Sequence, residues 1–412
     1  MSLLEYSTDR LRAIIEEVER LASTDFPHRH SADVLKMVGG IFQERLSAIE
    51  RLDDKNDISV IKAICSDSLG KLFTFLPLLG FILRSTNVRN SFEVYGPTLR
   101  LARQLLGDQT KLLISSEWNF SPFVYRPLDG LPGVVLIGLP ACESQNPLLL
   151  PLAGHELGHA LWRQKTVENS VMEGVQKSIA SEFERRVDYF RELFPTAASP
   201  SDAGAMGDLF YSRVLYQTAI WTLARCEETF CDFVGIRLFG EGYLHAFGYL
   251  LSPGGLGRSP HYPAMAARIS NMLTASEVLN VPAPDNFRES FDTDQLPQYA
   301  DKESSFMSEV SDVALQTLTT RLLDAVNENI PAALAARSQE GIDRVYRAFT
   351  LAVPATSTDG LASIVNAGWK AYHDKDFWSG IPDLHKKKGE VLRDLILKNI
   401  ELLEIEEIMG TT

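Results

Sequence analysis

The sequence predicts an α+β protein that is predominantly α-helical and has one small β-sheet. Apolar residues recur at helical spacing along most of the chain, as at Leu11, Ile15 and Val18. Two runs near the middle, residues 111–116 and 133–139, are instead aliphatic or β-branched and bounded by Gly and Pro, which is typical of strands. Because 412 residues exceed what one hydrophobic core usually fills, we expect more than one packed unit.

The helical pattern begins at the N-terminus and covers residues 1–110. A loop at residues 23–31 interrupts it and carries His28 and His30, which we expect to be solvated because residues two apart do not share a helix face. After the two strands, Asn146-Pro147 has the pattern of a helix cap followed by a first helical residue. Helical spacing then continues to Gly240, with a break at residues 195–207.

Two irregular segments and a final helical region make up the rest of the chain. Residues 252–263 are rich in Gly and Pro, and residues 281–299 are rich in Pro and Asp, which predicts a loop and a linker. Helical spacing returns at residues 310–326, 342–352, 361–372 and 390–409. The predicted parts are therefore a helical N-terminal region (1–110), a core (111–275), a linker or long loop (276–305) and a helical C-terminal region (306–412).

The charge balance narrows the class of partner. The chain carries 40 Lys and Arg against 54 Asp and Glu, a formal net charge of −14. This balance argues against nucleic acid, because phosphate binding depends on clustered cations. With 45% apolar and 23% charged residues, the chain has the composition of a globular protein and not of a disordered or collagen-like one.

The cysteines and the apolar runs predict a cytoplasmic protein. Four cysteines without a C-x-x-C pair are too few for a disulfide framework, and we expect Cys226 and Cys231 to be small buried residues. The first twelve residues lack the apolar stretch of a secretory signal. The longest apolar run, residues 72–83, is shorter than a bilayer span and predicts a buried helix. We therefore expect no integral membrane segment.

One motif points to chemistry: His155, Glu156 and His159 form the pattern H-E-x-x-H. Residues four apart project from the same face of a helix, so the two imidazoles can bind one Zn²⁺. Glu156 is rotated about 100° from His155, beside the open position of the metal, where a carboxylate can take a proton from water. The flanking residues are strongly apolar, so these polar side chains need partners in the interior.

A catalytic zinc site needs a third protein ligand. The motif in which another histidine follows closely is excluded, because Trp162 and Lys165 stand where it requires glycine and histidine. Glu228 is the best candidate, and Asp232, four residues later, can accept the remaining N–H of a ligand histidine. Glu227 is the alternative ligand. The competing interpretation is that these carboxylates form a solvated helix face.

The pattern H-E-L-G-H followed by E-x-x-x-D resembles the gluzincins, particularly the family of the HtpX heat-shock protease and the CaaX prenyl-protein protease. The segment Ser-Pro-His-Tyr-Pro at 259–263, with the Arg-Ile pair at 268–269, resembles a further motif of that family. The resemblance extends over residues 133–269 and implies that the core of residues 111–275 is a zincin-like catalytic core. It also implies zinc bound by His155, His159 and Glu228, with Glu156 as the base and Asp232 as the hydrogen-bond partner of His155.

The sequence departs from the family in two respects. Tyr262 stands where the family has a histidine, and His261 precedes it. Either side chain, or Arg268, can donate a hydrogen bond to a developing oxyanion, although Arg268 can instead hold the turn through a salt bridge. Family members are frequently embedded in membranes, and this chain is predicted to have no spanning helix, so a lipidated substrate does not carry over.

The predicted function is zinc-dependent hydrolysis of peptide bonds in a peptide or protein substrate. In zincin folds the sheet edge beside the active-site helix pairs with an extended substrate, so residues 133–139 are expected to bind the substrate backbone. The alternative is that these residues form a buried core strand. A rival interpretation is a non-proteolytic zinc-containing interaction or regulatory protein with a helical partner-binding surface. A zinc hydrolase of non-peptide amides is a third. Glu156 favours catalysis, because a purely structural zinc site has no use for a base.

Overall fold

The computed structural model describes residues 3–53, 55–88, 91–117, 122–124, 130–143, 145–202, 204–254, 259–291, 301–335, 338–356 and 360–410. The chain forms two compact units, Met1–Gln145 and Asn146–Thr412. The described residues are predominantly helical with one three-stranded sheet, which confirms the predicted α+β class. The boundary between the units lies inside the predicted core of residues 111–275.

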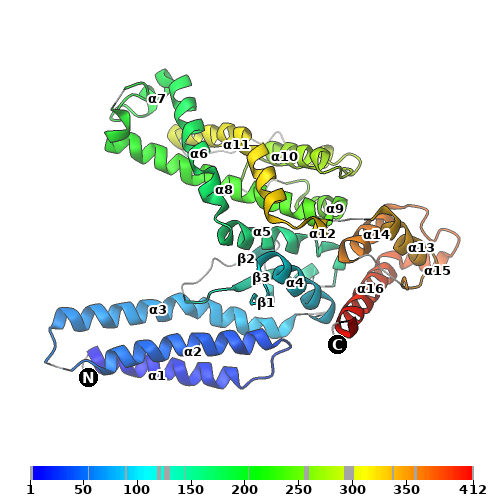
Figure 1. Ribbon diagram of the computed structural model, residues 1–412, viewed down its shortest axis with the longest axis horizontal. Helices are drawn as coiled ribbons and strands as arrows, with labels where there is room; N and C mark the ends of the chain where they lie inside the picture. The colour runs from blue at the N-terminus through cyan, green and yellow to red at the C-terminus, as the bar shows by residue number, and fades with distance from the viewer. Residues whose placement is uncertain are drawn as a thin grey trace. The chain divides into compact units, whose positions relative to one another are not determined.

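Three long helices form the body of the first unit. Helices α1 (Leu3–Ala22), α2 (Arg29–Glu50) and α3 (Ile58–Arg84) pack side by side (Figure 1). Asp57 caps α3 by accepting a hydrogen bond from the Ser59 N–H at 2.7 Å. The apolar stripes predicted from the sequence face one another, and the buried side chains include Leu11, Val18, Val38, Phe42, Phe75 and Phe81.

Helix α3 contains the predicted apolar run. By length and composition it is the one helix among the described residues that could cross a membrane, and 39% of its most apolar window is buried. Phe75 and Leu78 lie in the core, whereas Phe73 and Leu76 are exposed. The predicted buried helix is therefore buried on one face only. A core helix of a soluble protein can have the same length and composition, so α3 is evidence neither for nor against a membrane segment. The lack of a membrane segment stays a prediction.

The sheet follows a short turn, η1 (Ser85–Asn87), and α4 (Ser91–Leu106). Strand β1 (Lys111–Glu117) pairs in parallel with β3 (Val134–Pro140), and β2 (Phe123–Val124) pairs antiparallel with β3. Both predicted strands are confirmed, within a residue at each end. The order β1-β3-β2 makes β3 the central strand. The prediction that residues 133–139 form an open sheet edge is therefore wrong where β2 pairs with β3. The run is a buried core strand, as its nearly continuous apolar sequence favours.

The second unit is built around α8 (Leu209–Phe239), whose first turn is capped by Asp208. Helices α6 (Val167–Arg185) and α11 (Lys302–Asn329) pack along it, and α5 (Leu152–Gln164) packs against it (Figure 1). The short turn η2 (Ala141–Glu143) belongs to the first unit. The other elements of the second unit are η3 (Pro147–Leu149), α7 (Val187–Leu193), η4 (Ala205–Gly207), α9 (Glu241–Leu251), α10 (Met265–Val278), η5 (Arg288–Ser290), α12 (Ala332–Ala335), α13 (Gln339–Thr350), α14 (Leu361–His373), α15 (Pro382–Lys386) and α16 (Lys388–Gly410).

The placement of α11 differs from the predicted division of the chain. Its Phe306 packs with Phe183, Phe190 and Tyr211 in one aromatic cluster. Helix α8 is buried on most of its sides and needs this cover, so α11 belongs to the same unit. Within the predicted linker, residues 281–291 include the buried Val281, Phe287 and Phe291, and residues 292–300 lie outside the described ranges.

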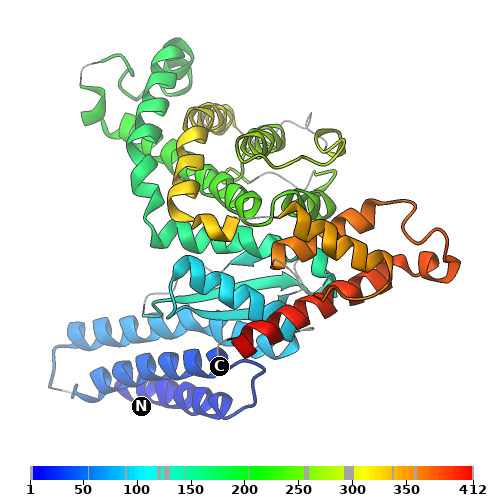
Figure 2. The same cartoon turned by 45° about the vertical axis from the view of Figure 1, so that its right-hand side comes forward.

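Helix α14 contacts the segment that leads into α5 and the turn between α8 and α9. Trp369 of α14 donates its indole N–H to the Leu148 carbonyl of η3 at 3.0 Å. The Asn366 side chain donates to the Phe239 carbonyl at 2.7 Å and accepts from the Gly242 N–H at 2.8 Å. Helix α14 therefore fixes the segment before α5 and the turn between α8 and α9. Figure 2 shows these helices from a second side.

Candidate metal centre

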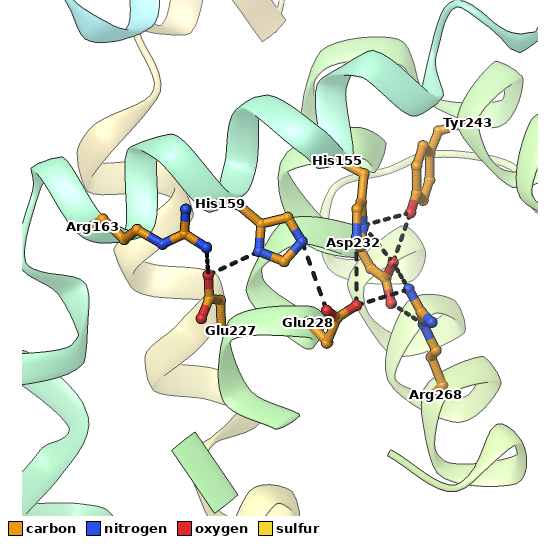
Figure 3. Close-up of polar contacts among 8 residues, drawn as sticks. All are labelled: His155, His159, Arg163, Glu227, Glu228, Asp232, Tyr243 and Arg268. Atoms are coloured by element: carbon orange, nitrogen blue, oxygen red, sulfur yellow. Dashed lines mark hydrogen bonds and ion pairs between the residues drawn. The ribbon is translucent and has the colours of Figure 1, made fainter. Parts of the chain in front are cut away.

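Two glycines allow α5 to lie directly on α8. A Cβ atom at Gly158 would come within 2.9 Å of the Cys231 Cα, and one at Gly154 within 3.1 Å of the Phe239 ring. Glycine at these positions, one turn apart, brings the two backbones together. His155 and His159, each next to one of these glycines, consequently reach the carboxylates of α8 (Figure 3).

Both histidines turn the same ring nitrogen toward one carboxylate. The Nε2 atom of His155 lies 3.5 Å from one Glu228 oxygen, and the Nε2 atom of His159 lies 3.7 Å from the other. Donor atoms bound tetrahedrally to Zn²⁺ at about 2.0–2.1 Å lie about 3.4 Å from one another. These three side chains, predicted as ligands from the sequence, are therefore candidates to hold a divalent metal ion.

The opposite ring nitrogen of each histidine contacts a different carboxylate. His155 Nδ1 lies 3.0 Å from Asp232, and His159 Nδ1 lies 2.8 Å from Glu227. A carboxylate that accepts the Nδ1 proton fixes the tautomer in which Nε2 carries the free lone pair. The structure places Glu227, the alternative ligand, in this orienting position. There Glu227 also accepts a hydrogen bond from Arg163 at 3.1 Å. Arg163 stands four residues after His159, and this spacing is the sequence pattern that could have predicted the contact.

Asp232 is held by a buried arginine. The Nε and Nη2 atoms of Arg268 donate to its two oxygens at 2.7 and 2.8 Å, and the same guanidinium lies 3.6 Å from Glu228. Burial alone would raise the pKa of Asp232, but Arg268 and His155 hold it well below its usual range. Of the two roles predicted for Arg268, oxyanion donor or salt bridge, its described contacts are those of the salt bridge.

Tyr243 completes the site and was not predicted from the sequence. Its hydroxyl donates to Asp232 at 2.7 Å and lies 3.2 Å from His155 Nδ1 (Figure 3). The ring lies against Gly235, where a Cβ atom would come within 2.4 Å of it. Burial and the charge of Asp232 raise the pKa of Tyr243 well above its usual value, so the phenol stays a donor. No motif marks this residue, because it reaches the site only through the turn at Gly240.

The interior of the site is electrostatically unusual. Glu156 is buried beside the two histidines, and burial raises its pKa. Burial alone would raise the pKa of Glu228, yet contacts with the histidines and Arg268 lower it. Burial would lower the pKa of His155, but Asp232 and Glu228 raise it to about 10. Carboxylates concentrated around two imidazoles form an environment that a divalent cation would neutralise.

Cys231 also lies close to the two histidines. Ligand atoms of Cys231, His155 and His159 all fall within 4.8 Å of one another. The thiol is fully buried where Gly158 packs on α8, and burial together with the surrounding carboxylates raises its pKa well above the usual value. Cys231 packs against Gly158 in the contact between α5 and α8, and its thiol is a further candidate ligand beside the two histidines. Cys226 is buried too, in agreement with the expectation for both residues.

The three predicted oxyanion donors lie in different surroundings. Tyr262 is 45% exposed, and its ring centroid is 5.8 Å from the Arg268 guanidinium. The charge of Glu228, with burial, raises the pKa of Tyr262 to about 12, so the phenol keeps its proton. His261 is exposed, and its backbone N–H donates to the Ser259 hydroxyl at 3.3 Å. Of Tyr262 and His261, Tyr262 is the one whose side chain has a described contact with a residue of the site, Arg268.

Comparison of the chain with protein-family models, with curated proteins and with solved structures gives no match. The resemblance to the gluzincins therefore rests on the sequence motifs alone, and it stays a prediction.

Proposed function

We propose that this protein is a zinc-dependent metallopeptidase with a zincin-like core. One observation carries the proposal: the Nε2 atoms of His155 and His159 both face the carboxylate of Glu228, while a separate carboxylate holds each Nδ1 atom. Two imidazoles, a third ligand and oriented tautomers are what a catalytic zinc site requires of the protein. A solvated helix face would leave these side chains exposed, and they are buried or nearly so.

The residues of the site divide the proposed reaction between them. His155, His159 and Glu228 would hold the ion; bound Zn²⁺ supplies a lowered pKa for water and polarises the carbonyl of the substrate. Glu156 takes a proton from the attacking water and later gives it to the leaving amine. Tyr262 donates a hydrogen bond to the oxyanion that develops.

The proposed substrate is a peptide or protein, and the proposed location is the cytoplasm. The net charge of −14 disfavours nucleic acid and suits a neutral or basic polypeptide. The rival function is a zinc-containing interaction protein without proteolytic activity. The two functions make different demands on Glu156, because only catalysis needs a group that exchanges protons with water.

The test combines metal analysis with digestion of a broad peptide library. We expect one equivalent of zinc, cleavage that a chelator abolishes, and loss of zinc in Glu228→Gln. Glu156→Gln should retain zinc and cleave about 10²- to 10⁴-fold more slowly. Glu173→Gln, which changes an exposed carboxylate on α6, is the matched control and should cleave at the wild-type rate. Cleavage at the wild-type rate by Glu156→Gln would overturn the mechanism, and bound zinc without any cleavage would favour the interaction protein.

A further inference from the structure

A buried arginine close to the metal centre takes no part in the proposed reaction. Arg225 lies on α8, three residues before Glu228, and its side chain is fully buried. A buried charge is costly unless geometry and hydrogen bonds compensate for it. We propose that Arg225 is a positioning residue that holds Tyr262 in place by anchoring the loop at residues 259–263; its importance for cleavage rests on the proposed function.

The guanidinium of Arg225 joins three segments. Its Nε atom donates to the Pro260 carbonyl at 3.0 Å. On the opposite side, Nη1 and Nη2 donate to the Ser308 carbonyl and hydroxyl at 2.6 and 2.7 Å, and Asp312 lies 2.8 Å from Nη1. The donors of a guanidinium point in fixed directions within one plane. Attachment to α11 therefore fixes the direction in which Nε meets the loop.

The anchored carbonyl lies within the turn that carries Tyr262. The Tyr262 N–H donates to the Ser259 carbonyl at 3.1 Å, so Pro260 is enclosed in the same turn. The backbone of Tyr262 is thus tied to α8 through Arg225, and its ring lies near the guanidinium of Arg268. The described contacts of His155, His159 and Glu228 come from α5, α8, Tyr243 of α9 and Arg268 of α10, and not from the loop at residues 259–263. Loss of the anchor should move the phenol and leave the metal ligands in place.

A simpler role for Arg225 is to staple α8 to α11, since Ser308 and Asp312 both belong to α11. The two roles separate experimentally. Arg225→Lys keeps the charge but cannot reproduce three directed contacts, so it should loosen the turn. Ser308→Ala removes only the hydroxyl contact, and it leaves the Ser308 carbonyl, Asp312 and Pro260 to hold the guanidinium, which makes it the matched control.

The first measurement is hydrogen exchange of the amides in residues 259–266, with zinc affinity measured in parallel. In Arg225→Lys we expect exchange of the turn to rise about tenfold or more, with zinc affinity within about twofold of wild type. Ser308→Ala should leave the turn protected. Unchanged protection in Arg225→Lys would overturn the proposal, and so would equal loss of protection in both variants. If Arg225→Lys does not fold, Arg225→Gln replaces it under the same criteria.

The second measurement is a double-mutant cycle on cleavage. Arg225→Lys should lower kcat about ten- to a hundredfold with little change in KM, because a displaced donor weakens the transition state more than binding. Adding Tyr262→Phe should cause little further loss if both residues act through the same phenol. Multiplicative losses would show that Arg225 does not act through Tyr262. If the wild-type protein cleaves nothing, the proposed function fails, whereas the exchange measurement still decides whether Arg225 anchors the loop.

Discussion

Each unit of the molecule contains a pair of histidines withdrawn from solvent, and the two pairs have opposite electrostatics. In the second unit, His155 and His159 stand four apart on α5 and face the carboxylates of α8. In the first unit, His28 and His30 stand two apart at the start of α2. The surroundings raise the pKa of His155 to about 10 and lower that of His28 to about 4.

The neighbours of the N-terminal pair explain this difference. His30 Nδ1 accepts a hydrogen bond from the Leu112 N–H at 3.1 Å, and the His28 ring stacks on Tyr95 with centroids 3.5 Å apart. Burial and the charge of Arg103 lower the pKa of His30, and burial lowers that of His28. The expectation that both histidines are solvated holds only in part, because both are partly buried against Tyr95 of α4 and Leu112 of β1. The two pairs therefore differ in more than their spacing: only in the candidate metal centre does a carboxylate lie behind each imidazole.

Removal of the central carboxylate should have the largest effect. Asp232→Asn leaves the buried Arg268 with a much weaker partner, so we expect a loss of about 3–5 kcal/mol in the free energy of unfolding. Urea unfolding followed by tryptophan fluorescence reports mainly on the second unit, which contains Trp162, Trp221, Trp369 and Trp378.

Asp343→Asn is the control for this experiment. Asp343 pairs with Lys370 at 2.8 Å on the surface, where an ion pair contributes about 0–1 kcal/mol. Equal losses in the two variants would contradict the view that the buried carboxylates organise the second unit.

Gly158→Ala tests the helix contact that brings the metal-site residues together. The added methyl group would lie 2.9 Å from the Cys231 Cα, so α5 must shift, at a cost of about 1–3 kcal/mol in the free energy of unfolding. Zinc affinity, measured by chelator competition, should fall with it. Gly70→Ala in α3 meets no atom within 4 Å and should stabilise its helix by up to about 1 kcal/mol, as measured by circular dichroism during unfolding. A stable Gly158→Ala with unchanged zinc affinity would disprove the role of this close contact.

Glu227→Gln tests the carboxylate behind His159. The amide removes the charge that orients the imidazole, and we expect zinc affinity to fall about 10- to 100-fold. Glu309→Gln, at an exposed carboxylate that pairs with Arg186, should leave the affinity unchanged. An affinity lost completely would instead make Glu227 a ligand, and an unchanged affinity would leave it without a role in the site.

The smallest effect is expected from acid in the first unit. The pKa of His28 is near 6.5 in the unfolded chain and about 4 in the folded one, so the unfolded state binds more protons between these values. Stability is therefore complete above about pH 6.5 and falls as the pH drops toward 4, by about 1–2 kcal/mol for this partly exposed group.

Hydrogen exchange around Leu112 at several pH values measures this loss, with His28→Gln as the control. The charged or titratable groups around the pair are Arg103, Lys111, Asp33 and Tyr95. Exchange that keeps the same pH dependence in His28→Gln would assign the effect to His30 or to another of these groups.

The local features of the fold were predictable because their patterns are local. The strands agree with their predicted ends to within a residue, and the last predicted helix, residues 390–409, matches α16 (Lys388–Gly410) closely. The cap predicted at Asn146 exists, but it begins the turn η3, and α5 starts only at Leu152. Periodicity and cap residues define elements without fixing their exact ends.

The partners of the site were less predictable because they come together only in the tertiary structure. The spacing of Glu228 and Asp232 identified two side chains on one helix. The contact of Tyr243 with Asp232, in contrast, depends on the turn at Gly240, and the cover that α11 gives to α8 depends on packing across some eighty residues, as in the Arg225–Ser308 contact. No local pattern records such distances.

The hydrogen bond between Trp369 and Leu148 has a consequence for synthesis of the protein. Its two residues are 221 positions apart, and it fixes the segment that leads into α5. At about 5–20 residues per second, a ribosome needs about 10–45 s to pass from one to the other. We expect the N-terminal unit to fold during this interval, while α5 and α8 wait for α14. The growing chain would thus acquire the geometry of the candidate metal centre only after α14 has been made.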